Sequence, residues 1–93
     1  MFYHVSIHHP KSGKEDALIA SMHRFAAALA GAPGLISAHT LKDEKTGDLM
    51  GMTICESREA MLASVHLARE AVRNDPFDEW EADDGLGWML SDV

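Results

Sequence analysis

The chain has 93 residues, of which 46% are hydrophobic and 25% charged, and its formal net charge is -7 at pH 7. These proportions exclude a disordered chain, and an acidic balance without a basic stripe argues against nucleic acid or an anionic membrane as partner. The length predicts one domain covering residues 1–93. No apolar run is long enough to cross a membrane and no secretion signal is recognisable, so we expect a cytoplasmic protein.

The first predicted element is a strand over residues 2–9, because polar and apolar residues alternate there. Pro10 ends it. The alternation divides the side chains between two faces of a sheet: Tyr3, Val5 and Ile7 on one, and His4, Ser6 and His8 on the other.

The first helix is predicted to begin at a capping box formed by Ser12 and Glu15. Gly31 suits the left-handed conformation that often follows a helix, and Pro33 prevents continuation. Apolar residues between these ends recur at spacings of four, three and four, which predicts one helix face packed on a sheet: Leu18, Met22, Phe25 and Leu29.

The middle of the chain predicts a hairpin and a second helix. Residues 35–41 and 49–55 are typical of antiparallel strands, joined by a polar loop over residues 43–47. Ser57 is expected to cap the helix that follows. The apolar face of this helix repeats the earlier spacing: Met61, Val65, Ala68 and Val72.

The C-terminal part predicts a short helix and a last strand. Asp75 and Pro76 resemble a cap and first-turn pair for a helix ending near Trp80, and residues 86–93 are typical of a strand. This part carries the net charge, without any Lys or Arg, and we expect it to be a solvated acidic surface. Its acidic residues are Asp75, Asp78, Glu79, Glu81, Asp83, Asp84 and Asp92.

The order strand, helix, strand, strand, helix, strand predicts an α+β fold with one four-stranded sheet and one helical layer. One helical layer covers only one face of a sheet, and the third strand is apolar on both faces. We therefore expect a homodimer in which a second copy covers the bare face. Cys55 is the only cysteine, which excludes a disulfide within the chain and a Cys-rich metal site.

Three short segments, in their order and spacing, resemble the antibiotic biosynthesis monooxygenase-like domains of the dimeric α/β-barrel superfamily. They are residues 12–16 (SGKED), 32–35 (APGL) and 56–60 (ESREA). The resemblance implies a ferredoxin-like βαββαβ fold that dimerises into a closed barrel. It also implies an enzyme that oxidises a small aromatic, quinol-like or polyketide-like molecule with molecular oxygen and without a cofactor.

The resemblance further implies a ligand pocket between the sheet and the helices, in which the anion of the substrate reduces oxygen. Ser6 falls near a strand position that is often Asn in the family, so we expect His4 as the catalytic base and Ser6 as an anion-orienting group. The expected substrate-binding residues are His8, His39, Cys55 and Trp88. The facing of His39 depends on the hairpin register, and Trp88 could line the pocket or cover the sheet edge.

Haem breakdown, which one branch of the same superfamily performs, is disfavoured. Cys55 stands where that branch has a Trp, and Arg73 stands near the position of its axial His. A metal site is not expected either: His4 and His8 lie about 13 Å apart along their strand, and His66 with Glu70 lacks a third ligand.

No Ser-His-Asp order or paired-carboxylate motif is apparent in the sequence. Two functions therefore remain open. The first is a cofactor-independent monooxygenase acting on a small aromatic ligand. The second is a non-catalytic dimeric module that binds a small molecule or a partner protein.

Overall fold

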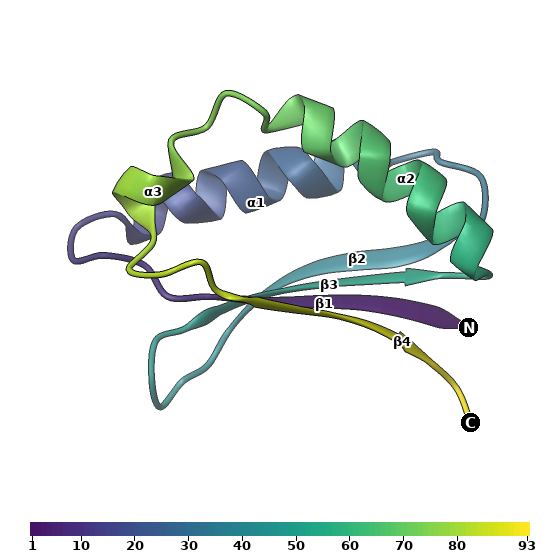
Figure 1. Ribbon diagram of the computed structural model, residues 1–93, viewed down its shortest axis with the longest axis horizontal. Helices are drawn as coiled ribbons and strands as arrows, with labels where there is room; N and C mark the ends of the chain where they lie inside the picture. The colour runs from purple at the N-terminus through teal and green to yellow at the C-terminus, as the bar shows by residue number, and fades with distance from the viewer.

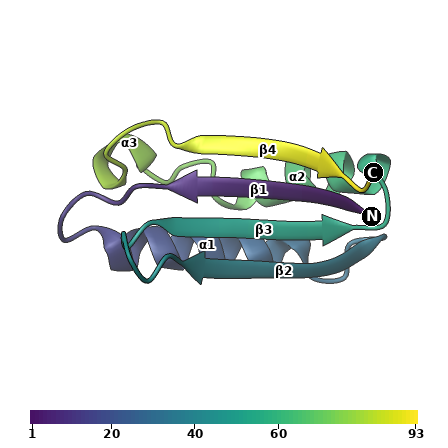
Figure 2. The ribbon, with the colours of Figure 1, turned by 90° about the horizontal axis from the view of Figure 1, so that it is seen from below.

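The computed structural model describes residues 1–93, and its elements follow the predicted order. The four strands form one antiparallel sheet in the order β2-β3-β1-β4, which is the ferredoxin-like arrangement (Figure 2). The helices all lie on one side of it (Figure 1). The predicted α+β, ferredoxin-like fold is thus confirmed. The elements are β1 Phe2–His8, α1 Glu15–Leu29, β2 Leu35–Lys42, β3 Leu49–Cys55, α2 Arg58–Ala71, α3 Phe77–Trp80 and β4 Leu86–Ser91.

The strand register assigns each side chain to one face of the sheet, because residues paired directly across strands point the same way. Ser6 of β1 pairs with Gly51 of β3 and with Gly87 of β4. The helix-covered face carries His4, Ser6, His8, Leu49, Thr53 and Cys55. The other face carries Tyr3, Val5, Ile7, Met50, Met52, Ile54 and Trp88.

The core consists of two buried clusters between the sheet and the helices. The first contains Leu18, Met22 and Leu49, with Phe77 and Trp80 packed against it. The second, towards the opposite end of the sheet, contains Cys55, Met61 and Val65, with Phe2, Phe25 and Leu35 packed against it. Both clusters use the apolar helix faces that the sequence pattern predicts.

The helix ends show which of the predicted capping interactions form. The Oγ of Ser57 accepts a hydrogen bond from the backbone N–H of Ala60 at 3.1 Å, so the predicted cap of α2 is confirmed. The capping box predicted for α1 is wrong: the helix begins after Lys14 without a side-chain cap. Glu15 instead accepts a hydrogen bond from the Nζ of Lys42 at 2.6 Å, because β2 brings that ammonium group within reach.

The C-terminal acidic residues are mostly a solvated surface, but that prediction is wrong for Asp75 and Glu81, whose side chains are only 18% and 10% exposed. Asp75 does not cap α3 through its side chain, because its carboxylate accepts hydrogen bonds from the Oγ of Ser21 and the Nη2 of Arg24, both at 2.6 Å. Asp92 accepts a hydrogen bond from the hydroxyl of Tyr3 at 3.0 Å, but its side chain is 60% exposed and stays solvated as predicted. These partners lie far away in the sequence, which is why the local absence of cations was misleading.

The sheet face opposite the helices is uncovered in the single chain (Figure 1). Every second residue of β4 points to this face, and these side chains are strongly exposed: Leu86 is 61% exposed, Trp88 41% and Leu90 46%. None of the helices combines the length and the apolar character that crossing a bilayer requires.

Candidate functional site

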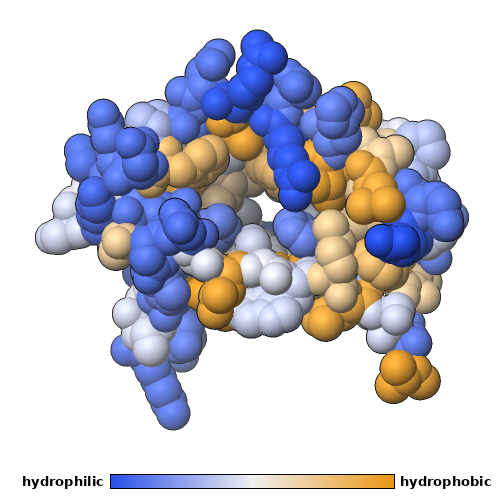
Figure 3. Space-filling model, viewed as in Figure 1, coloured by the Kyte–Doolittle hydropathy of each residue, from blue (hydrophilic) through white to orange (hydrophobic).

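A cavity of about 230 Å³ lies between the sheet and the helical layer. His4 and Ser6 of β1 contribute to its floor, Met22 and Phe25 of α1 and Arg69 of α2 to its roof. The hollow between the two layers opens towards the viewer in Figure 3. The cavity therefore combines apolar walls with a few polar groups, which is typical of a small-molecule site.

The sheet is bare around Ser6, because the residues paired with it on both sides are glycines. A Cβ atom at Gly51 would lie 2.9 Å from the Oγ of Ser6 and 3.7 Å from the Cε of Met22. Gly51 borders the cavity and Gly87 does not. The absence of a side chain at Gly51 thus leaves the space that the hydroxyl of Ser6 occupies.

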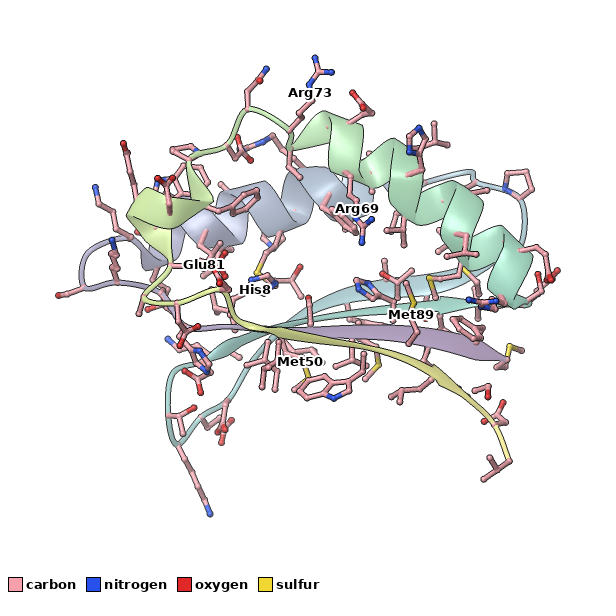
Figure 4. The ribbon with its side chains drawn as sticks, viewed as in Figure 1. His8, Met50, Arg69, Arg73, Glu81 and Met89 are labelled. Atoms are coloured by element: carbon pink, nitrogen blue, oxygen red, sulfur yellow. The ribbon has the colours of Figure 1, made fainter.

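Ser6, His8 and Glu81 form a connected row of polar groups. The Nε2 of His8 lies 3.0 Å from the Oγ of Ser6, and its Nδ1 lies 2.5 Å from the Oε1 of Glu81 (Figure 4). The side chain of His8 is 23% exposed and that of Glu81 only 10%. The carboxylate of Glu81 accepts a hydrogen bond from the Nδ1–H of His8, which leaves Nε2 to accept a hydrogen bond from the hydroxyl of Ser6.

The backbone places Glu81 beside His8 although α3 and β1 are distant in sequence. Pro10 and Glu81 form an isolated antiparallel bridge, and the N–H of Ala82 donates to the carbonyl of His9 at 2.7 Å. The segment after α3 is thereby fastened to the end of β1. The carboxylate is held by main-chain hydrogen bonds rather than by its own side-chain contact alone.

Arg69 is the cation of the cavity. Its side chain descends from α2 towards the sheet, whereas that of Arg73 points outward (Figure 4). Arg73 pairs with Glu70 at 3.2 Å, while Arg69 has no carboxylate partner. An unneutralised guanidinium facing a small cavity favours an anionic ligand or a developing negative charge.

His4 is the second imidazole on the cavity floor. Its burial, then the positive charge of Arg69 and the proximity of His8, lower the pKa of His4 below its ordinary value of 6.5. At neutral pH the ring is therefore uncharged. It has no carboxylate partner of the kind that His8 has in Glu81.

Comparison with known proteins gives a clear result for the fold. No protein-family model and no curated protein matches the sequence. Solved structures do match along the whole chain, among them a protein of Nitrosomonas europaea assigned as an antibiotic biosynthesis monooxygenase. Its identity is 14% and its TM-score 0.77, and the match covers 100% of this chain and 99% of the other. The chain has the antibiotic biosynthesis monooxygenase-like fold.

Two further solved structures share the antibiotic biosynthesis monooxygenase-like fold with this chain. A protein of Chloroflexus aurantiacus J-10-fl with the same assignment is 22% identical at a TM-score of 0.73, covering 99% of this chain and 92% of its own. SnoaB of Streptomyces nogalater, a cofactor-independent oxygenase, is 13% identical at a TM-score of 0.72 with the same coverage. Identities this low establish a shared fold and leave the activity to the site itself.

Three of the residues predicted for the site, His4, Ser6 and His8, line the cavity within this antibiotic biosynthesis monooxygenase-like fold. Cys55 does not: it is fully buried in the core, with its Sγ 3.9 Å from the Sδ of Met61. Burial raises the pKa of this thiol and keeps it protonated. The placement of Cys55 corrects its predicted position in a ligand pocket.

Trp88 and His39 depart from the predicted arrangement through the strand register. Trp88 pairs with Val5, so it lies on the uncovered face and away from the cavity. His39 borders the cavity but pairs with Met52, which directs its side chain to the uncovered face. For His39 the cause is a register shift in β2 between residues 35 and 37, which changes the facing of the residues that follow, whereas the facing of Trp88 is set by its pairing with β1.

The sequence interpretation missed Arg69 and Glu81. Arg69 adjoins the apolar stripe of α2 and has no acidic residue three or four positions away on either side, which was an available signal of an unpaired cation. Glu81 had no comparable signal, because its partner is 73 residues away. Nowhere do three His, Cys, Asp or Glu side chains come close enough together to bind a metal ion.

Proposed function

We propose that this protein is a cofactor-independent monooxygenase that acts on a small, acidic aromatic molecule such as a quinol. One observation carries the proposal: a proton acceptor, His8 held by Glu81, and an unpaired cation, Arg69, face the same cavity. Deprotonation of a quinol gives an electron-rich anion that reduces molecular oxygen. The protein then has to remove the proton, hold the anion and exclude water.

The row of polar groups supports His8, rather than His4, as the base. The substrate proton passes to the Oγ of Ser6 while the hydroxyl proton of Ser6 moves to Nε2 of His8, and the carboxylate of Glu81 stabilises the imidazolium. His4 is less suited, because burial and Arg69 disfavour its charged form. Arg69 stabilises the substrate oxyanion, from which electrons pass to oxygen. The substrate supplies all four electrons: a quinol and O2 give a hydroxyquinone, which keeps one oxygen atom, and water, which carries the other.

The dimensions of the cavity support a substrate of one or two rings. Its volume of about 230 Å³ is below the roughly 300–1,000 Å³ common for sites of drug-sized ligands. Phe25 and Phe77 contribute aromatic surface to its walls. A larger polycyclic polyketide would need the helical layer to move away from the sheet.

A homodimer through the uncovered sheet face is part of the proposal. The exposed side chains of β4 continue the apolar row formed by Val5 and Met52 in the neighbouring strands. Monomeric proteins rarely leave such a contiguous apolar surface in water. Two copies packed face to face would enclose both rows and give the closed barrel that the resemblance implies.

The decisive experiment is oxygen uptake with hydroquinones and naphthoquinols, corrected for their uncatalysed oxidation. We expect the protein to accelerate uptake and a Ser6→Trp variant, which fills the cavity, to lose the acceleration. Ser12→Trp, in the exposed loop before α1, is the matched control and retains it. Failure of the wild-type chain to accelerate uptake with a quinol that it binds would favour the non-catalytic binding module.

A further inference from the structure

The row formed by Ser6, His8 and Glu81 supports a second kind of chemistry. We propose that Ser6 is a nucleophile and that the cavity has an acyl-transfer activity, hydrolysing small aryl esters. This activity goes beyond the oxygenase function and needs no oxidant. The residues are those of a Ser-His-carboxylate arrangement, recognised by its geometry and independent of the order of its members in the chain.

The contacts of His8 distinguish it from the other histidines. One ring nitrogen lies 3.0 Å from a serine hydroxyl and the other 2.5 Å from a carboxylate. His9 also contacts a carboxylate, Asp83, but its other nitrogen faces Asp48 at 3.6 Å. Only His8 therefore joins a hydroxyl to a largely buried carboxylate, 10% exposed, which is the arrangement that activates a serine.

The position of Ser6 allows a substrate to reach it. Ser6 and His8 line the cavity, and Glu81 lies behind His8 without lining it. Gly51 beside Ser6 leaves the hydroxyl unobstructed on that side. Arg69 lines the roof of the same cavity as a cation without a carboxylate partner, and it can stabilise an oxyanion formed on the substrate.

The reaction proceeds in two balanced steps. The Oγ of Ser6 attacks the ester carbonyl carbon and its proton passes to Nε2 of His8; the bond to the aryl oxygen then breaks, and the phenol leaves with that proton. Water attacks the resulting acyl-Ser6, gives a proton to His8, and releases a carboxylic acid as Ser6 recovers its proton. Glu81 stabilises the imidazolium in both steps.

The test is performed under nitrogen without any quinol, so its outcome does not depend on the oxygenase function. Mixing the purified protein with p-nitrophenyl acetate is expected to release up to one equivalent of p-nitrophenolate per chain in a rapid first phase. Intact mass and peptide mapping should locate one acetyl group on Ser6, and a fluorophosphonate probe should label the same residue. Absence of both modifications, or their location on another residue, would overturn the proposal.

Matched variants separate nucleophilic attack from general structural effects. Ser6→Ala should abolish acylation, and Glu81→Gln should slow it by about 100-fold or more. Gly51→Ala places a methyl group 2.9 Å from the hydroxyl of Ser6 and should also slow it. Gly87→Ala, on the other side of Ser6, meets no atom closer than 3.8 Å and should acylate like the wild type.

Equal acylation rates in the two glycine variants would contradict the role assigned to Ser6. Circular dichroism of each variant shows whether it is folded. If Ser6→Ala does not fold, the modified residue identified in the wild-type chain still decides the question.

Discussion

The Nδ1 of His8 lies 2.5 Å from the Oε1 of Glu81, although the two residues are 73 positions apart in the chain. The contact depends on the segment after α3, which hydrogen-bonds to the end of β1 through Ala82 and His9. A carboxylate in this position holds the imidazole in one tautomer and orients its other nitrogen towards Ser6. The reactivity that we propose for the cavity therefore depends on a residue that does not line it.

The role of Glu81 is testable through the tautomer of His8. In the wild-type chain, nitrogen NMR should find the proton of the neutral ring on Nδ1. Glu81→Gln should mix the two tautomers and reduce quinol-dependent oxygen uptake by about 100-fold. Glu79 is an exposed glutamate on α3, so Glu79→Gln should change neither the tautomer of His8 nor the oxygen uptake. A single Nδ1-protonated tautomer in Glu81→Gln would show that another group orients the ring.

The titration of His4 should report the charge of Arg69. Burial and Arg69 lower the pKa of His4 below 6.5, so Arg69→Met should raise this pKa towards 6.5, whereas Arg73→Met should leave it unchanged. Proton NMR of the imidazole ring measures the pKa of His4 in both variants. An unchanged pKa of His4 in Arg69→Met would mean that burial and His8 account for the shift without Arg69.

His4 also gives a defined sign to the pH dependence of stability. Its pKa is lower in the folded chain than the unfolded value of 6.5. The unfolded chain therefore binds the proton more readily, and the stabilisation is present above pH 6.5 and lost as the pH falls through the folded pKa. Urea unfolding between pH 5 and 8 should show a smaller loss in Arg69→Met than in the wild type.

Asp83 and Asp84 should behave differently despite being neighbours. An oxygen of Asp83 lies 3.0 Å from the Nδ1 of His9, and the carboxylate accepts a hydrogen bond from the backbone N–H of Gly85. Both contacts lower the pKa of Asp83, and the contact with Asp83 raises the pKa of His9. Asp83→Asn should lower the pKa of His9, and Asp84→Asn should not. Ring NMR again provides the measurement, and identical His9 titrations in the two variants would contradict the contact.

The pH window of this pair follows from the directions of its two shifts. The raised pKa of His9 gives a stabilisation that is present below 6.5 and lost as the pH rises through the folded value. The lowered pKa of Asp83 gives a second stabilisation, which is present above pH 3.8 and is lost as the pH falls through the folded value. The pair should therefore stabilise the chain fully between pH 3.8 and 6.5.

Met52→Asp should disrupt the proposed homodimer. Met52 lies on the uncovered face in the middle of β3. A second copy packed on this face would remove the introduced carboxylate from water without giving it a partner. Leu67→Asp, on the exposed side of α2, is the matched control and should stay dimeric. Light scattering after size exclusion should give twice 10.2 kDa for wild type and control. A wild-type mass of 10.2 kDa at micromolar concentration would overturn the dimer.

Local patterns predicted the fold well. Alternation in residues 2–9 and the spacing of apolar residues in both helices correctly indicated the elements, because these periods arise within each segment. The cap at Ser57 was also readable, since its hydrogen bond spans three residues. The capping box at Ser12 failed because the helix begins at Glu15, so that Lys14 and not Ser12 occupies the N-cap position.

By itself, the sequence determined the order of the elements and the division of β1 into two faces, because residues close together in the chain specify these features. The presence of one helical layer predicted an uncovered sheet face, and the family resemblance indicated which face of β1 meets the helices. Only the tertiary structure decided where His39 and Trp88 point and which groups meet His8 and Asp75. A register shift in β2 changes the facing of the residues after it, and the path of the segment after α3 selects the partners of the acidic residues. These features depend on contacts between segments that lie far apart along the chain, and no local period records such contacts.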